Sequence, residues 1–370
     1  MPGAQGTIQI QQGKGSRVMI IQYYVGSRPE ELEAVRAGIR EWGLRVQPST
    51  GEGAESPDAQ IHVDNVFGDV KDSHRREVAT FNCVKSVTAI EGVPQNLSLV
   101  RRGERHAVEI PNPYSGGSIS IGEGHPLVIL AGVCAVDKDY TLDSNRMAKE
   151  AGADINRGGA FKPRTSPYDF QGLKEEGLKL LTDVRAEVGL PIVSEVLDVR
   201  DVDLFMKYDV DILQTGTRNA QNFELLIEVG RTGKPVLYKR GFSNTMEETL
   251  KAANYIMEQG NENLILCLRG VKGIGNSFRN QGDLDEIVYL RQVCDRPIVY
   301  DLSHSAGRKS AVPGIGNMAA AGGADGLLLD VHVAPQHALV DGFQAIDSRE
   351  DLARMIGMWR KLHKLVQEAA

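Results

Sequence analysis

Basic and hydroxyl-bearing residues are concentrated in the segment 157–172, whose sequence is RGGAFKPRTSPYDFQG. They are Arg157, Lys162, Arg164, Thr165 and Ser166. Glycine lets the backbone approach a ligand, proline fixes φ, and the forked guanidinium of arginine matches phosphate and carboxylate oxygens. A solvated basic loop would have the same composition, but this segment follows an apolar, strand-like run, and similar basic residues follow later strands. We therefore interpret it as a binding site for phosphate and carboxylate groups.

Length, composition and charge limit the class of protein. The 370 residues, of which 41% are hydrophobic and 25% charged, are enough for one large domain and a small one. The formal net charge of -7 argues against nucleic-acid binding, which needs a concentrated positive surface. There is no apolar run long enough to cross a bilayer and no leader of the secretory kind. We therefore expect a soluble, cytoplasmic protein with neither nucleic-acid nor membrane partners.

The chain divides into four stretches. Residues 1–16 are rich in Gly and Gln without periodicity, which is typical of a flexible tail. Residues 17–102 give a strand, a helix, a strand, a polar helix-like stretch and a strand, an order that predicts a small ferredoxin-like α+β domain. Residues 103–125 are rich in Gly, Pro and Ser and are expected to form a linker or hairpin. Residues 126–370 form the long remainder.

The remainder alternates apolar runs with polar segments of helical periodicity. The runs that read as strands are LVILAGVC, ADINRGG, PIVSEV, DILQTG, PVLYKRG, LILCLRG, PIVYDLSH and GLLLDVH. This is the number of strands that closes a (β/α)8 TIM barrel, the fold we predict here. An open doubly wound sheet is the alternative, but no G-x-G-x-x-G turn follows the first run. Residues 348–367 are predicted to form the closing helix, with Ser348 and Asp351 placed for a capping box.

In such a barrel, the active site lies at the carboxyl ends of the strands. The polar residues expected there are Cys134, Arg157, Lys162, Arg164, Glu195, Arg218, Lys239, Arg240, Arg269, Asp301, His304 and Asp330. Desolvating many charges is costly unless they are paired. A bound, multiply charged anion would offset that cost.

Residues of the types that bind metal ions occur among these strand ends. The cysteines are scattered and form no CxxC pair, so each is a buried thiol or a lone ligand: Cys83, Cys134, Cys267 and Cys294. Cys134, His304, Asp330 and Asp341 could meet at one divalent ion, and that ligand set suits Mn, Fe, Co or Zn better than Mg or Ca. Ordinary structural roles for all four stay open on spacing alone. His332 is interpreted as structural.

Several stretches carry a resemblance to one family. They are RGGAFKPRTSPYDFQGLKEEGLKLL, LQTGTRNAQNFELL, PVLYKRGFSNTMEETLKAANYI, DLSHSAGRK and HALVDG. Together they resemble 3-deoxy-D-arabino-heptulosonate 7-phosphate (DAHP) synthase of the type I beta subclass, and the N-terminal unit resembles the regulatory domain of some members. The resemblance implies condensation of phosphoenolpyruvate with erythrose 4-phosphate, the first step of the shikimate pathway. It also implies a divalent metal, a homodimer or homotetramer, and an aromatic amino acid as effector.

The resemblance assigns roles residue by residue. Phosphoenolpyruvate would be held by Arg157, Lys162, Arg218, Lys239 and Arg269. The phosphate of the aldehyde would be bound by Arg164, Thr165 and Ser166. The metal ligands would be Cys134, His304, Asp330 and Asp341, and the catalytic residues Lys162, His304 and Asp301. Lys162 would donate a proton to the developing alkoxide.

Departures from the family pattern cluster near the metal ligands. They are Val133, Leu268, Leu302, Asp330 and Phe343, with Asp330 standing where the family has Glu. Two alternatives therefore stay open: a paralogue that uses another phosphorylated aldehyde, and a non-catalytic relative that senses an amino acid. Trp42, in the N-terminal unit, is interpreted as a core residue rather than part of an effector site.

Overall fold

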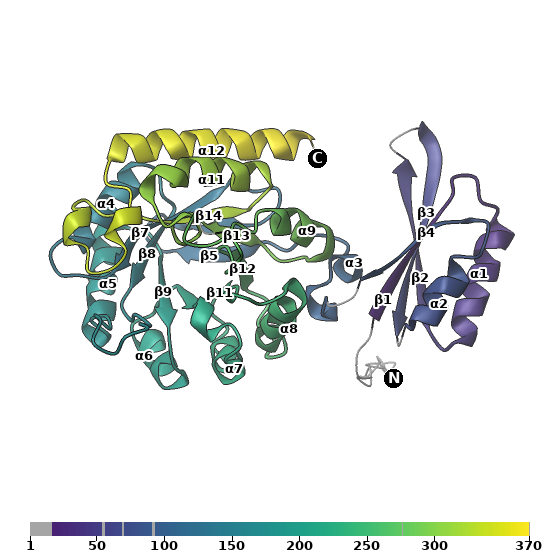
Figure 1. Ribbon diagram of the computed structural model, residues 1–370, viewed down its shortest axis with the longest axis horizontal. Helices are drawn as coiled ribbons and strands as arrows, with labels where there is room; N and C mark the ends of the chain where they lie inside the picture. The colour runs from purple at the N-terminus through teal and green to yellow at the C-terminus, as the bar shows by residue number, and fades with distance from the viewer. Residues whose placement is uncertain (1–16, 54–55, 69, 91–92, 276, 370) are drawn as a thin grey trace, which may run out of the picture. The chain divides into compact units, whose positions relative to one another are not determined.

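The computed structural model describes residues 17–53, 56–68, 70–90, 93–275 and 277–369. It contains two compact units, Met1–Gly92 and Val93–Ala370, which are described separately below (Figure 1). The tail expected over residues 1–16 lies outside the described residues. Within the described part of the chain, no helix is both long and apolar enough to span a membrane.

The first unit is an antiparallel sheet with two helices. Its elements, in chain order, are β1 (Arg17–Tyr23), α1 (Pro29–Glu41), β2 (Arg45–Gly53), β3 (Ser56–Gly68), α2 (Asp72–Val78) and β4 (Val84–Ile90). The strand order is β2-β3-β1-β4, with β1 antiparallel to both β3 and β4. This β-α-β-β-α-β order is that of the ferredoxin-like fold, which confirms the predicted class of the small unit.

One strand of this unit, β2, was not predicted from the sequence. It contains Pro48, Gly51 and Gly53, which are turn-forming residues and rare inside strands. Among the described strands, β2 lies at the edge of the sheet and pairs with β3 alone. A proline at an edge can leave its missing N–H on the unpaired side. The position at the edge therefore explains why a strand forms from a sequence that reads as a turn.

A buried polar network links the sheet of this unit to helix α1. Asp64 on β3 is fully buried; it accepts a 2.7 Å hydrogen bond from the Tyr23 hydroxyl and two more from Arg36 Nε and Nη2, at 2.7 and 2.8 Å. Trp42 packs at the margin of the apolar core and stacks on His74, with ring centroids 4.5 Å apart. The buried carboxylate is thus paired and hydrogen-bonded, as a stable core requires.

The second unit is a closed barrel of eight parallel strands (Figure 1), as predicted. The strands are β7 (Val128–Ala135), β8 (Ile155–Gly159), β9 (Ile192–Val196), β10 (Ile212–Thr215), β11 (Val236–Lys239), β12 (Leu264–Leu268), β13 (Ile298–Asp301) and β14 (Gly326–Asp330). The barrel closes where β14 pairs with β7. All eight strands coincide with the predicted apolar runs, because residues facing the barrel interior and residues facing the helices are both buried.

Helices follow the strands around the barrel. They are α4 (Thr141–Glu150), α5 (Glu175–Val188), α6 (Val202–Lys207), α7 (Phe223–Arg231), α8 (Met246–Met257), α9 (Asp285–Val293), α10 (Leu302–Ala306), α11 (Val312–Ala321) and α12 (Arg349–Ala369). The closing helix α12 buries Trp359 completely, and Ser348 Oγ accepts the backbone N–H of Asp351, as the capping signal predicted. The short α10, which follows β13 directly, carries His304.

A hairpin fills one end of the barrel. It consists of β5 (Val108–Asn112) and β6 (Gly117–Ile121), within the stretch expected to be a linker or hairpin. Val108, Ile110 and Ile121 belong to the same buried cluster as the interior residues of the barrel strands. The hairpin is therefore an apolar plug.

The division between the two units falls earlier than the limit at residue 102 that the sequence suggested. The last turn before the hairpin is α3 (Leu99–Arg102), and it belongs to the barrel unit. Arg102 forms ion pairs with Glu262, at 3.0 Å, and with Asp295, at 2.7 Å, both of which are barrel residues. These contacts attach the stretch to the barrel.

Candidate active site

Most of the predicted site residues lie at or just beyond the carboxyl ends of barrel strands. Cys134, Arg157, Lys239, Asp301 and Asp330 are in the strands β7, β8, β11, β13 and β14. Lys162, Arg218, Arg269 and His304 follow the ends of β8, β10, β12 and β13. Barrel closure brings these residues to one face, which is where barrel enzymes hold their substrates.

A cavity of about 210 Å³ opens at this face. The predicted residues that line it are Arg157, Lys162, Arg164, Thr165, Glu195, Arg218, Lys239, Arg269, His304 and Asp341. Ser166 does not line it; the Ser166 hydroxyl accepts the backbone N–H of Tyr168 at 3.3 Å. Cys134, Asp301 and Asp330 lie behind the lining.

The cations of the cavity fall into two groups. Four of them have a carboxylate partner, in the pairs Arg157 with Asp330, Arg164 with Asp169, Lys239 with Asp301 and Arg279 with Asp341. The other three, Lys162, Arg218 and Arg269, have no carboxylate partner among the residues that the structure describes. These three positive charges make the cavity a site for an anion of more than one charge.

Arg269 is a buried cation that a bound anion would stabilise. It is 4% exposed, and its hydrogen bonds go to neutral groups, the Thr217 hydroxyl at 3.4 Å and the His304 carbonyl at 3.3 Å. The Phe242 ring lies 4.8 Å from its guanidinium carbon. Burial lowers the pKa of Arg269, although the Asp301 charge opposes this effect. A bound anion would supply the missing countercharge.

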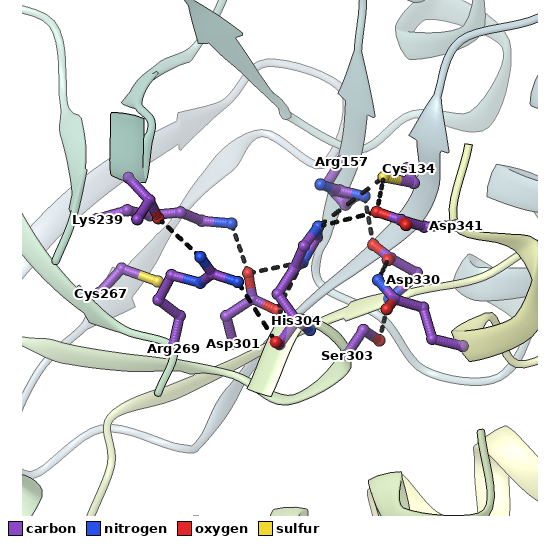
Figure 2. A network of polar contacts seen from close by, with 12 residues as sticks. Cys134, Arg157, Lys239, Cys267, Arg269, Asp301, Ser303, His304, Asp330 and Asp341 are labelled. Carbon is purple, nitrogen blue, oxygen red and sulfur yellow. Dashed lines mark hydrogen bonds and ion pairs between the residues drawn. The ribbon is translucent and has the colours of Figure 1, made fainter. Parts of the chain in front are cut away.

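Three candidate metal ligands converge beside the cations (Figure 2). Cys134 Sγ lies 3.9 Å from His304 Nε2 and 3.7 Å from Asp341 Oδ2, and the latter two atoms are 3.7 Å apart. Ligand atoms bound to one tetrahedral ion are separated by about 3.5 Å. A thiolate, an imidazole and a carboxylate suit a borderline transition ion. The residues therefore fit a divalent metal, and they are the part of the predicted set that the fold brings together.

Electrostatics favour the ligand form of Cys134. Burial alone would raise the pKa of its thiol, but the nearby charges of Lys162 and Arg157 outweigh burial and lower it. Lys162 Nζ donates to the Cys134 carbonyl at 3.1 Å and lies 3.4 Å from Sγ. The thiolate, the form that binds metals, is thereby stabilised.

Asp301 orients the candidate ligand His304. It is fully buried, accepts the backbone N–H of His304 at 3.1 Å, and lies 3.0 Å from Nδ1 of the same residue. Burial would raise the pKa of Asp301, but the charges of His304 and Lys239 hold it well below its ordinary value. An ionised carboxylate on Nδ1 leaves Nε2 free to face Cys134 and Asp341, as carboxylates behind metal-binding histidines do.

Asp330, the fourth predicted ligand, does not join this group. Its carboxylate forms an ion pair with Arg157 and accepts a 2.6 Å hydrogen bond from Gln344 Nε2. Among the described residues, the cluster of ligand atoms close enough to share an ion contains only Cys134, His304 and Asp341.

Asp341, the third candidate ligand, lies in a turn whose backbone geometry few residue types can adopt. Asp341 has φ of 57°, in the left-handed region that Asp tolerates better than most residues. A Cβ on the following Gly342 would lie 2.1 Å from the Pro335 carbonyl oxygen, so only glycine fits there. The sequence pair Asp341-Gly342 therefore builds the turn that presents the carboxylate.

The sequence did not single out Arg279, which the structure places in the site. It stands in the long loop between β12 and α9, and its Nη1 lies 3.1 Å from both Asp341 Oδ1 and Gln344 Oε1. The Arg279 Cβ packs against Gly307. A Cβ on Gly307 would lie 2.3 Å from the Arg279 Cβ, so a side chain at that position would displace Arg279. The local sequence SFRNQG contains no recognisable motif, so the place of Arg279 in the site could be found only from the fold.

The other departures from the family pattern are apolar. Val133, Leu268 and Leu302 are buried, and the Val133 carbonyl accepts a 3.2 Å hydrogen bond from Arg157. Phe343 is 65% exposed and does not line the cavity. These substitutions therefore leave the charged lining intact.

The fold and the site define a (β/α)8-barrel enzyme whose pocket accepts a multiply charged anion next to a candidate metal centre. The chain belongs to the DAHP synthetase I family, whose model matches residues 100–368.

Relatives and solved structures agree with this family. A phospho-2-dehydro-3-deoxyheptonate aldolase of Thermotoga maritima is 36% identical over 330 residues, which cover 89% of this chain and 93% of that protein. A 2-dehydro-3-deoxyphosphooctonate aldolase of Syntrophotalea carbinolica is 30% identical over 258 residues, covering 64% and 91%. The crystal structure of the Thermotoga maritima DAHP synthase superposes with a TM-score of 0.69 and 32% identity, covering 95% of this chain and 98% of that one.

Proposed function

We propose that this protein condenses phosphoenolpyruvate with erythrose 4-phosphate, giving 3-deoxy-D-arabino-heptulosonate 7-phosphate and phosphate. The observation that carries the proposal is the set of three cavity cations without a carboxylate partner among the described residues, next to the Cys134, His304 and Asp341 cluster. A substrate with both a phosphate and a carboxylate matches that charge.

Phosphoenolpyruvate is assigned to the inner cations. Lys162 and Arg269 are buried and Arg218 is exposed at the rim, so together they can reach the two anionic ends of one small substrate. Arg157 and Lys239, each held by a buried carboxylate, complete the set. Positive charge fixed around the phosphate also stabilises it as it leaves.

The aldehyde phosphate is assigned to Arg164 and Thr165, which line the cavity on the segment after β8. Ser166 belongs to the same assignment, but its hydroxyl is engaged with the backbone of its own loop. Arg164 is half-buried, which keeps its guanidinium accessible to a ligand from solvent.

A divalent ion would be held by Cys134, His304 and Asp341. When bound, it would supply Lewis-acid polarisation of the aldehyde carbonyl. Lys162 Nζ, 3.4 Å from Cys134 Sγ, is the donor that we assign to protonate the aldehyde oxygen as C3 of phosphoenolpyruvate adds to the carbonyl carbon. Water then adds at C2, and the hemiketal phosphate loses phosphate.

The two alternatives are not favoured. The Syntrophotalea carbinolica protein, whose name indicates another product, is less similar than the Thermotoga maritima protein and aligns with less of this chain. A non-catalytic sensor would not need the paired and unpaired cations that line the cavity. An aromatic amino acid as effector, and a homodimer or homotetramer, stay predictions; an inhibition panel of Phe, Tyr and Trp and a sedimentation measurement test them.

The test is phosphate release from phosphoenolpyruvate plus erythrose 4-phosphate. Chelator-stripped protein is compared with protein reloaded separately with Mn²⁺, Co²⁺, Zn²⁺ or Fe²⁺, with Cys134→Ala as control. We expect release that depends on metal and aldehyde and that is lost in the variant. Release with a different aldose phosphate but none with erythrose 4-phosphate would overturn the proposal.

A further inference from the structure

Both carboxylate oxygens of Asp330 are engaged by nitrogen donors of the protein. It is the last residue of β14 and is fully buried. Its Oδ1 pairs with Arg157, its Oδ2 accepts from Gln344, and its backbone N–H donates to Ser303 Oγ at 2.9 Å. Figure 2 shows its carboxylate next to Arg157, while Cys134, His304 and Asp341 point toward one another.

Arg157 depends on this carboxylate. The Arg157 side chain is almost completely buried on β8, where it also donates to the Val133 carbonyl at 3.2 Å and hydrogen-bonds with the Cys134 side chain. A buried guanidinium without an anionic partner is strongly unfavourable. Asp330 is thus the carboxylate that pairs directly with Arg157 and fixes it at the cavity wall.

Gln344 holds Asp330 in this orientation. Its side chain is completely buried, and its Oε1 accepts a 3.1 Å hydrogen bond from Arg279 Nη1. Because arginine can only donate, the carbonyl end of the Gln344 amide must face Arg279. The NH₂ end therefore faces Asp330, which as a carboxylate can only accept. The two charged neighbours determine the amide orientation.

We infer that Asp330 is a positioning residue for Arg157, clamped by Gln344, and that the metal has only three protein ligands. This rests on the proposed function, in which Arg157 binds phosphoenolpyruvate. The remaining coordination positions are left to water and substrate, as in metal sites that carry out catalysis. The Asp side chain is one methylene shorter than the Glu of the family pattern, which favours its pairing with Arg157.

Titration with Co²⁺ alone tests the ligand set, with competition by a chromophoric chelator and the visible absorption of bound Co²⁺ as readouts. We expect Asp341→Asn and Cys134→Ala to weaken Co²⁺ binding by about 100-fold or more, and Asp330→Asn to change it by less than about fivefold with the same spectrum. If Asp330→Asn weakened Co²⁺ binding as much as Asp341→Asn does, the inference would be overturned.

The affinity for phosphoenolpyruvate, measured by calorimetry, tests whether Asp330 positions Arg157. We expect Asp330→Asn to weaken it by about tenfold or more, because Arg157 loses its anchor. Gln344→Met, which keeps the side-chain volume and removes the donor to Asp330, should weaken it by a smaller factor and leave Co²⁺ affinity unchanged. Undiminished phosphoenolpyruvate affinity in both variants would contradict the positioning role.

The two proposals fail in different ways. Wild-type protein that binds Co²⁺ in the expected pattern but releases no phosphate would refute the condensation reaction and leave the three-ligand site standing. Circular dichroism of each variant identifies one that is misfolded, and Gln344→Met then decides in place of Asp330→Asn.

Discussion

Arg279 Nη1 lies 3.1 Å from Asp341 Oδ1, so a residue of the loop after β12 braces a candidate metal ligand of the loop after β14. The other oxygen of Asp341 faces His304 and Cys134. A cation on the outer oxygen fixes the direction in which the inner one points, as hydrogen-bonded partners behind metal ligands generally do.

We predict that Arg279→Ala weakens Co²⁺ binding by about tenfold, because Asp341 loses its brace, and that Arg279→Lys restores part of the affinity. Chelator competition measures both. Arg354→Ala is the matched control, since Arg354 forms an ion pair with Asp351 on the surface and is 79% exposed. Equal affinities for Arg279→Ala and the control would show that the ion pair does not position the ligand.

If Arg164 binds the aldehyde phosphate as proposed, Asp169 competes with that phosphate for the guanidinium. Its Oδ2 accepts from Arg164 Nε and Nη2 at 3.3 and 3.2 Å. We predict that Asp169→Asn lowers the KM for the phosphorylated aldehyde by about threefold, as expected for removing a partly exposed ion pair. The KM for phosphoenolpyruvate should not change. Steady-state kinetics at low ionic strength decide this, and a raised aldehyde KM would mean that Asp169 orients Arg164 instead.

Gly159 leaves room for Lys162. A Cβ at this position would lie 2.5 Å from the Cys134 carbonyl oxygen and 3.0 Å from Lys162 Nζ. Gly159→Ala should therefore displace the ammonium group and lower kcat by about 100-fold, the typical contribution of a placed proton donor. The measurement is kcat in the phosphate-release assay. Activity near that of the wild type would contradict the assignment of Lys162 as the proton donor.

Gly357 provides the control for that substitution. It is exposed on α12, and apart from its chain neighbours and the backbone of its own helix no atom lies within 4 Å of a Cβ built there. Gly357→Ala should raise the free energy of unfolding by about 0.5 to 1 kcal/mol, because alanine loses less backbone entropy in a helix. Urea denaturation checks the sign, with unchanged kcat. A lower unfolding free energy would count against the helical environment described for this residue.

The Tyr23 hydrogen bond to Asp64 gives the small unit a pH-dependent stability. Burial, followed by the bond to Asp64, raises the pKa of Tyr23. The folded pKa exceeds the unfolded value of about 10, so the stabilisation is complete below that pH and is lost as the pH rises above it. Tyr23→Phe should cost about 1 kcal/mol at neutral pH and less near pH 10.5.

Tryptophan fluorescence during urea unfolding measures this effect. The chain has two tryptophans, Trp42 in the small unit and Trp359 in the barrel. The transition that disappears in Trp42→Phe therefore reports the small unit. A wild-type stability of this unit that is constant between neutral pH and about pH 10.5 would rule out the linkage.

The barrel could be predicted because each strand is a run of residues that are buried on both faces, such as VILAGVC and GLLLD. The edge strand β2 could not, because its Pro48 and glycines carry the signal of a turn and only pairing with β3 makes it a strand. The periodicity of apolar residues reflects which side chains are buried, and an edge strand buries few side chains.

The candidate site was predicted in part. Residue type and position after a strand were enough to bring Cys134 and His304 together, because barrel closure is a general rule. They did not indicate that the Asp330 carboxylate pairs with Arg157 and accepts a hydrogen bond from Gln344, a residue 14 positions further along the chain. Arg279 was missed because its role depends on a contact with a loop that no sequence pattern connects to it.

In the part of the chain that the structure describes, the β5–β6 hairpin closes one end of the barrel. Its apolar residues fill the amino-terminal end of the barrel, opposite the charged cavity. Both substrates and both products must then pass through the same mouth. Release of product and entry of substrate would therefore share one path.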